Sequence, residues 1–116
     1  MEHVAWKGHI KPGYKQEYIR RHNEIWPEMV DALKAAGVCN YTIFACGDEL
    51  FGYYECVHGA AFAQKAQDES PVVARWCEMM SDIQVLSTEA DTLEQVFRLD
   101  LLEVFLCLSA HPNPLT

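Results

Sequence analysis

Hydrophobic residues recur with a period of two in some stretches of this chain and with a period of three to four in others. Side chains alternate along a strand and repeat about every turn of a helix, so the two periods predict strands and helices respectively. The stretches follow one another as strand, helix, strand, strand, helix, strand, over residues 4–11, 14–36, 38–45, 50–57, 59–67 with 70–83, and 92–99. This order predicts an α+β fold of the ferredoxin-like type, with an antiparallel sheet and helices on one face.

Individual residues mark where these elements end. Pro27 is expected to kink the first helical region, because proline removes a backbone donor and disfavours helix at the residue before it. Gly37 stands where a left-handed residue ends a helix, and Ser70-Pro71 has the pattern of a helix N-terminus. The turn residues 46–49 predict a hairpin between the two strands that flank them. Residues 84–91 are expected to form a loop.

The predicted hairpin carries apolar side chains on both faces, with Tyr41 and Ile43 on one and Thr42 and Phe44 on the other. Helices cover one face of such a sheet, so we expect a second copy of the chain to cover the other. Half of the residues are apolar, which in a short chain favours a buried interface or pocket.

The length of 116 residues fits one domain, which we expect over residues 1–100. The run Leu101–Leu108 is too apolar to face water freely. Residues 101–116 are therefore expected to form an extension that packs on the domain or on the partner copy. The alternative is a frayed, aggregation-prone end.

The charge balance excludes two classes of partner. Nine Lys and Arg stand against seventeen Asp and Glu, and the largest basic block is Arg20-Arg21. Nucleic acid and anionic membrane surfaces both require clustered basic residues, so neither is expected as a partner. No signal peptide and no membrane-spanning stretch is recognisable. The five cysteines include no CxxC pair, which favours free thiols in a reducing cytoplasm.

Tyr18 and His22 are the strongest candidates for chemistry. They are four residues apart, so they project from one helical face, and histidine exchanges protons near neutral pH. The alternative is a histidine buried beneath the sheet as part of the core. The aromatic and hydrogen-bonding residues around His22 make a poor hydrophobic stripe but would suit the wall of a polar pocket.

Other motifs are weaker. By position alone, Tyr41 and Trp76 are more typical of core or interface aromatics than of a site, and the cysteines Cys39, Cys56 and Cys77 are more typical of small core residues than of nucleophiles. The five histidines are scattered, so no metal site is predicted. The sequence contains no GxSxG, P-loop or GxGxxG motif, which leaves hydrolase and nucleotide-binding functions without support.

The tract YIRRHNEIWPEM at residues 18–29 resembles the signature of the L-rhamnose mutarotase family, which also includes fucose-acting relatives. The resemblance continues through residues 37–43, 75–82 and 94–99, and so covers about residues 3 to 100. It implies a cytoplasmic homodimer of the dimeric α/β-barrel type that interconverts sugar anomers without metal or organic cofactor.

Carried over by motif, His22 matches the general acid of the family, and Tyr18, Tyr41 and Trp76 match its sugar-contacting positions. The chain departs from the family at Cys77, where the rhamnose enzymes usually have a second tryptophan. This position is expected to contact substrate, and the change leaves the choice between L-rhamnose and L-fucose open. The chain after Asp100 is also longer than is usual in the family.

Anomer exchange requires a proton donor and a proton acceptor at a sugar whose ring opens and recloses. We hypothesise that His22 protonates the ring oxygen and that Tyr18 either hydrogen-bonds the anomeric region or relays the proton. Tyr41 would fix a sugar hydroxyl, and Trp76 would pack on the apolar face and the methyl group of the sugar. Two other classes remain: a monooxygenase of the same fold, and a non-catalytic dimeric sugar- or metabolite-sensing module.

Overall fold

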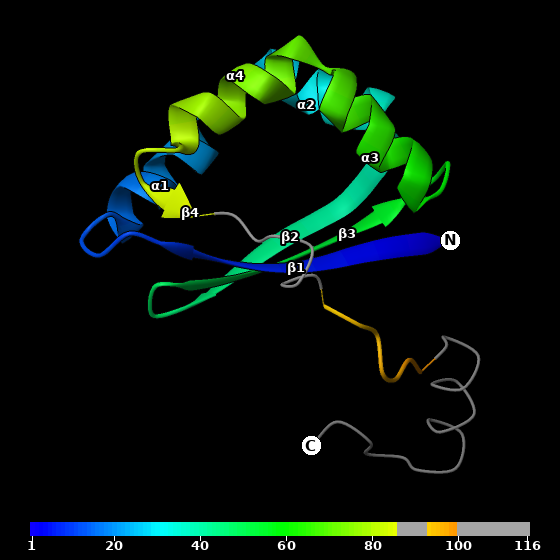
Figure 1. The fold of residues 1–116 in the computed structure, drawn as a ribbon, viewed down its shortest axis with the longest axis horizontal. Coiled ribbons are helices and arrows are strands. Elements are labelled where there is room, and N and C mark those ends of the chain that lie inside the picture. Colours follow the sequence, from blue (N-terminus) through cyan, green and yellow to red (C-terminus); the bar gives the residue numbers. More distant parts are fainter. Residues whose placement is uncertain (86–92, 100–116) are drawn as a thin grey trace, which may run out of the picture.

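A computed structural model describes residues 1–85 and 93–99 of the chain. Its elements are β1 (Glu2–Ile10), α1 (Lys15–Asn23), α2 (Pro27–Ala35), β2 (Val38–Cys46), β3 (Glu49–Cys56), α3 (Ala60–Glu69), α4 (Pro71–Met80) and β4 (Gln84–Val85). The strands form one sheet in the order β2-β3-β1-β4, and each neighbouring pair is antiparallel. All four helices lie on the same side of this sheet (Figure 1). The predicted ferredoxin-like α+β fold is thereby confirmed.

The helix boundaries follow the punctuation of the sequence. Pro27 is the first residue of α2, and Trp26 before it has extended backbone (φ −64°, ψ 137°), so the predicted kink is a full break between α1 and α2. Gly37 has φ +77°, the left-handed conformation expected after a helix. Ser70 caps α4 by accepting a hydrogen bond from the Val73 backbone N–H (3.3 Å).

The core fills the layer between helices and sheet. One buried cluster joins β1, β3, α1, α2 and α4, and a second lies toward α3 and the start of β2. Ile10 and Leu50 from the sheet meet Met80 at the end of α4 and Ile83 in the turn that follows it, and all four side chains are almost fully buried. Trp6 packs against both clusters. The helices are therefore held on the sheet by contacts at both ends of the layer.

A β-bulge in β2 decides which of its residues face the helices. Paired residues on neighbouring strands share a face, and β2 pairs Val38 with Cys56 but Ile43 with Gly52. Val38 and Ile43 are five positions apart, whereas their partners on β3 are four positions apart. β2 therefore contains one extra residue, and the register shifts between Cys39 and Thr42. The prediction that Ile43 and Thr42 belong to opposite faces is consistent with this register.

The position of the fourth strand was predicted wrongly. The strand at the edge of β1 is Gln84–Val85, inside the stretch expected to be a loop, and residues 93–99 form no regular strand. Only a short turn separates β4 from α4, and the Lys11 N–H donates to the Ile83 carbonyl (2.8 Å), which aligns β4 with the end of β1. Segment 93–99 begins at the same edge, where the Leu93 N–H donates to the Ala5 carbonyl (2.8 Å).

Cys39, Cys46, Cys56 and Cys77 are free thiols, as predicted. Cys56 is buried, but Cys77 is exposed, so its assignment to the core was wrong.

In residues 1–85 and 93–99, no helix is long and apolar enough to cross a membrane. The predicted extension at residues 101–116 lies outside the described residues.

Candidate active site

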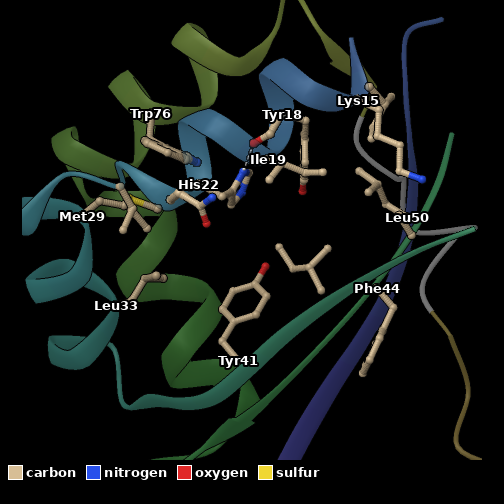
Figure 2. A pocket seen from close by; sticks show the side chains of 15 residues that line it. Lys15, Tyr18, Ile19, His22, Met29, Leu33, Tyr41, Phe44, Leu50 and Trp76 are labelled. Atoms are coloured by element: carbon tan, nitrogen blue, oxygen red, sulfur yellow. Dashed lines mark hydrogen bonds between the residues drawn. The ribbon is translucent and has the colours of Figure 1, made fainter. Parts of the chain in front are cut away.

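A cavity of about 420 Å³ opens between α1, α2 and α4 on one side and β2 and β3 on the other. We call it the His22 cavity. Figure 2 shows His22 on the helical wall and Tyr41 on the sheet wall, with open space between them. Its lining consists of Ile10, Lys15, Tyr18, Ile19, His22, Asn23, Ile25, Met29, Leu33, Tyr41, Ile43, Phe44, Ala45, Leu50 and Trp76. Apolar side chains dominate, and a small set of polar groups stands among them.

Helix α1 fixes which nitrogen of His22 can react. The His22 Nδ1 lies 3.0 Å from the Tyr18 backbone carbonyl one turn earlier. A carbonyl can only accept, so Nδ1 carries the proton in this bond, and Nε2 is the nitrogen left to meet a ligand. The ring of Tyr18 stacks on the imidazole, with centroids 4.2 Å apart. Both predicted catalytic side chains are thus brought together.

The surroundings of His22 favour its neutral form. Burial lowers the pKa of His22 from its ordinary value near 6.5, and the hydrogen bond to the Tyr18 carbonyl opposes this only in part. Trp76 contributes to the burial, because its ring meets the imidazole edge-on with centroids 5.4 Å apart. Burial also raises the pKa of Tyr18 to about 12. At pH 7 the site therefore holds an uncharged base beside an uncharged phenol.

Trp76 forms part of both the cavity wall and the core. Its side chain is buried, and its ring also packs edge-on against Trp26, with centroids 5.2 Å apart. Trp26 precedes Pro27 at the break between α1 and α2, so this contact joins the break to α4. The break in the helical region and the position of Trp76 are therefore coupled by direct packing.

Tyr41 faces the helical wall because of the bulge in β2. Its ring packs against Tyr54 of β3 (4.9 Å between centroids), and its hydroxyl accepts a hydrogen bond from the indole N–H of Trp6 (3.0 Å). Burial raises the pKa of Tyr41, and the Trp6 bond offsets a part of this. Tyr41 therefore brings a neutral hydroxyl to the wall opposite His22.

The predicted site residues do not all reach the cavity. Tyr18, His22, Tyr41 and Trp76 line it, whereas Cys77 lies outside the lining. A substrate contact at Cys77 remains a prediction. Two polar lining residues, Lys15 and Asn23, were not predicted as site residues, although Asn23 belongs to the tract around His22 that was expected to form a pocket wall. Lys15 lies three and seven residues before Tyr18 and His22, a helical spacing that places all three on one face and could have revealed it.

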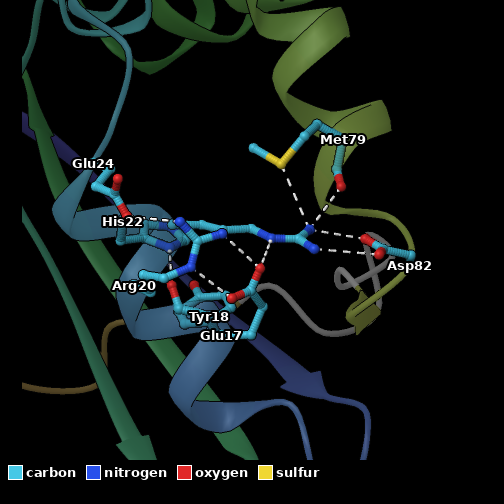
Figure 3. Close-up of polar contacts among 8 residues, drawn as sticks. Glu17, Tyr18, Arg20, His22, Glu24, Met79 and Asp82 are labelled. Atoms are coloured by element: carbon cyan, nitrogen blue, oxygen red, sulfur yellow. Dashed lines mark hydrogen bonds and ion pairs between the residues drawn. The ribbon is translucent and has the colours of Figure 1, made fainter.

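A network of charges holds the helical wall together. Arg21 of α1 donates to the Met79 carbonyl at the end of α4 (2.9 Å) and to both carboxylate oxygens of Asp82 (2.9 and 3.3 Å). Its Nε also donates to Glu17 (2.8 Å). Figure 3 shows these contacts, which lie between α1 and the end of α4. Because Arg21 precedes His22, this clamp fixes the histidine relative to Trp76.

Replacing Glu17 with glutamine is expected to lower the melting temperature at pH 7. Hydrogen bonds from Arg20 and Arg21 lower the pKa of Glu17 from 4.5 to about 2, so the carboxylate stabilises the fold above pH 4.5 and loses this effect as the pH falls to about 2. The difference in melting temperature between wild type and variant should therefore shrink over that range. Exposed Glu78 on α4 supplies the control, and an equal loss in Glu78→Gln would contradict the expectation.

The site is suited to proton transfer on a small neutral molecule. In the part of the chain that the structure describes, no three His, Cys, Asp or Glu side chains gather as metal ligands. The groups that line the cavity are an imidazole whose Nε2 is left for a ligand, two phenols, an amide, the Lys15 side chain and an aromatic wall. This set can move a proton at a sugar or similar ligand and can pack against an apolar face.

Known proteins resemble the chain in sequence over most of its length. A family model described as L-rhamnose mutarotase matches residues 3–106. The L-rhamnose mutarotase of Burkholderia cenocepacia (strain HI2424) is 38% identical over 97 residues, which cover 82% of this chain and 91% of the relative. That of Listeria monocytogenes serovar 1/2a (strain EGD-e) is 38% identical over 107 residues, which cover 90% and 97%.

Solved structures also resemble the chain over most of its length. The crystal structure of an L-rhamnose mutarotase from Formosa agariphila matches with a TM-score of 0.73 and 29% identity, over 86% of this chain and 100% of that one. Tetracenomycin F2 cyclase of Streptomyces glaucescens matches with a TM-score of 0.64 over 86% and 98%, but its 9% identity supports a likeness of fold alone. On the family model and these relatives, the chain belongs to the L-rhamnose mutarotase family.

Proposed function

We propose that this chain interconverts the α and β anomers of L-rhamnose by acid-base catalysis at His22. The observation that carries the proposal is the neutral imidazole, held through Nδ1 with Nε2 left for substrate, in a small cavity opposite the hydroxyl of Tyr41. The family membership supports the same reaction.

One histidine can serve both proton transfers of ring opening. Neutral His22 takes the proton of the anomeric hydroxyl on Nε2, and the resulting imidazolium acts as general acid and gives this proton to the ring oxygen as the bond from that oxygen to the anomeric carbon breaks. The product is the open aldehyde, and no proton is gained or lost overall. Rotation of the aldehyde and reversal of the two transfers closes the ring as the other anomer.

The remaining residues bind and orient the sugar. Tyr18 lies against the imidazole, so its hydroxyl is placed to contact the anomeric region, and Tyr41 holds a sugar hydroxyl from the opposite wall. Trp76 and the aliphatic lining suit the apolar face and the methyl group of a 6-deoxy sugar. A neutral sugar needs no steering by charge, so the net charge of −8 is compatible with this substrate.

Saturation-transfer NMR on equilibrated L-rhamnose tests this proposal. The wild-type chain should accelerate exchange between the two anomeric signals above the spontaneous rate, and L-fucose in a parallel sample tests the alternative sugar. Faster exchange of L-fucose than of L-rhamnose would reassign the substrate. Sugar binding without exchange of either sugar would favour the non-catalytic sensing module.

The rate of anomer exchange should fall on the acidic side of neutral pH only. Because the cycle starts from neutral His22, kcat/KM should be constant above pH 7 and should fall tenfold per pH unit below the lowered pKa of His22, which lies under 6.5. Polarimetric initial rates from freshly dissolved α-L-rhamnose, corrected for the buffer rate, measure this profile. A kcat/KM that rises on acidification would assign the starting state to the imidazolium instead.

We further propose a homodimer in the cytoplasm, with the open face of the sheet as the interface. Phe44 borders the His22 cavity, but it alternates with Ile43 along β2 and its side chain is 65% exposed. Val96 and Phe97 are 89% and 77% exposed in the single chain. Segment 93–99 lies on the side of the sheet away from the helices (Figure 1). Burial of these side chains against a second copy would remove them from water, and free thiols suit a reducing compartment. The mass in solution, from light scattering, tests the dimer.

A further inference from the structure

Trp6 and Tyr41 are joined by a hydrogen bond that crosses a whole strand. Trp6 is on β1 and Tyr41 on β2, and β3 lies between these strands in the sheet. Gly52 of β3 is the direct partner of Trp6 in the register. A Cβ atom at Gly52 would lie 2.1 Å from Cε2 and 2.3 Å from Nε1 of the indole, which no real structure could hold. Because Gly52 has no side chain, the Trp6 ring can lie over β3 and reach Tyr41.

The direction of this hydrogen bond decides what Tyr41 can offer a ligand. An indole N–H can only donate, so the Tyr41 oxygen accepts from Trp6. The phenolic proton must then point elsewhere; Tyr41 lines the His22 cavity, and Figure 2 shows its hydroxyl directed toward the His22 wall. Trp6 thereby leaves Tyr41 with a proton to donate into the cavity.

Two further contacts restrict Tyr41 from the other sides. The ring of Tyr54 packs against the Tyr41 ring and limits its rotation. At the bulge, Asn40 has the left-handed φ of +51°, and its side-chain amide donates to the Glu55 carboxylate. Asparagine adopts this conformation more readily than most non-glycine residues, and its hydrogen bond to Glu55 holds the bulge in place. The backbone on one side of Tyr41 and the hydroxyl at its tip are thus both held.

We propose that Trp6, seated on Gly52, is a positioning residue that sets the Tyr41 hydroxyl as a hydrogen-bond donor to a sugar oxygen. The inference rests on the proposed function for its ligand class, and it adds a residue that does not line the cavity. Trp6 acts through Tyr41, so its removal should weaken sugar binding and leave the proton transfers at His22 unchanged. Loss of uniform binding raises KM at constant kcat.

Trp6→Phe removes the indole N–H and keeps an aromatic ring over Gly52. We expect the KM for α-L-rhamnose, measured by polarimetry, and its Kd, measured by calorimetry, to rise about three- to tenfold, as loss of one neutral hydrogen bond predicts. The value of kcat should stay within about twofold. Tyr14→Phe is the matched control, because Tyr14 is exposed and lies outside the cavity lining.

A double-mutant cycle separates positioning from packing. In the Tyr41→Phe background the hydroxyl is absent, so adding Trp6→Phe should change KM and Kd no further. Gly52→Ala, which displaces the indole, should raise KM in the wild-type background only. Unchanged KM and Kd in Trp6→Phe, or an equal rise with and without the Tyr41 hydroxyl, would overturn the inference. A wild type that binds L-rhamnose without exchange would refute the proposed function, while the Kd cycle would still decide the role of Trp6.

Discussion

Glutamine in place of His22 is expected to slow enzyme-catalysed anomer exchange by about a hundred- to ten-thousand-fold, the range that a positioned acid-base group contributes. An amide can donate and accept hydrogen bonds, but it cannot take up a proton and pass it on at neutral pH. The variant should therefore still bind the sugar while losing the two proton transfers. This is the largest effect on activity that the site predicts.

Saturation-transfer NMR measures this loss against the rate in buffer. His9→Gln makes the same chemical change at an exposed residue of β1, and it should exchange the anomers at the wild-type rate. Thermal melting checks the fold of both variants, because the His22 ring packs against Tyr18 and Trp76. Exchange at the wild-type rate in a folded His22→Gln variant would remove His22 from the mechanism.

Tyr18→Phe separates the hydroxyl from the helix geometry. The phenyl ring can still stack on the imidazole, and the Tyr18 carbonyl that holds His22 Nδ1 belongs to the backbone. The loss of activity in this variant therefore reports the hydroxyl alone. It should be smaller than that of His22→Gln, since a phenol with a pKa of about 12 contributes little acidity at pH 7.

Local signals in the sequence were sufficient to predict most of the fold. Pro27 and Ser70 act within one turn of their own position, so the break between α1 and α2 and the start of α4 were predictable. The fourth strand was not predictable, because its identity depends on which of two segments pairs with the edge of β1. Gln84–Val85 follows α4 after a short turn, and this proximity outweighs the stronger alternation of residues 93–99.

The part of the site that lies on one helix was predictable from the sequence. Tyr18 and His22 share a face of α1 by spacing alone, whereas Tyr41 reaches them through a bulge. Strict alternation counted from Val38, whose partner Cys56 is buried, would have turned Tyr41 to the open face. The bulge depends on Asn40 in a left-handed conformation, which the sequence does not encode by a glycine. Contacts between distant strands, such as Trp6 with Tyr41, have no sequence period to reveal them.

Trp76 carries the largest expected effect on stability. Its side chain is buried between α1, α2 and the sheet, and its ring contacts His22 and Trp26 edge-on. Trp76→Ala should lower the free energy of unfolding by about 3–5 kcal/mol, because it removes a large buried ring and leaves a void in the wall. Urea titration at pH 7 measures the loss, and Val57→Ala, at an exposed valine after β3, should cost far less.

Trp76→Phe distinguishes the two roles of this residue. A phenyl ring fills most of the same space, so much of the stability lost in Trp76→Ala should return, while the smaller ring covers less of the sugar and of the imidazole. With less burial, the pKa of His22 should move back toward 6.5, and the acidic limb of kcat/KM should shift to higher pH. A Trp76→Phe variant with wild-type stability, affinity and pH profile would show that the indole edge itself does nothing at the site.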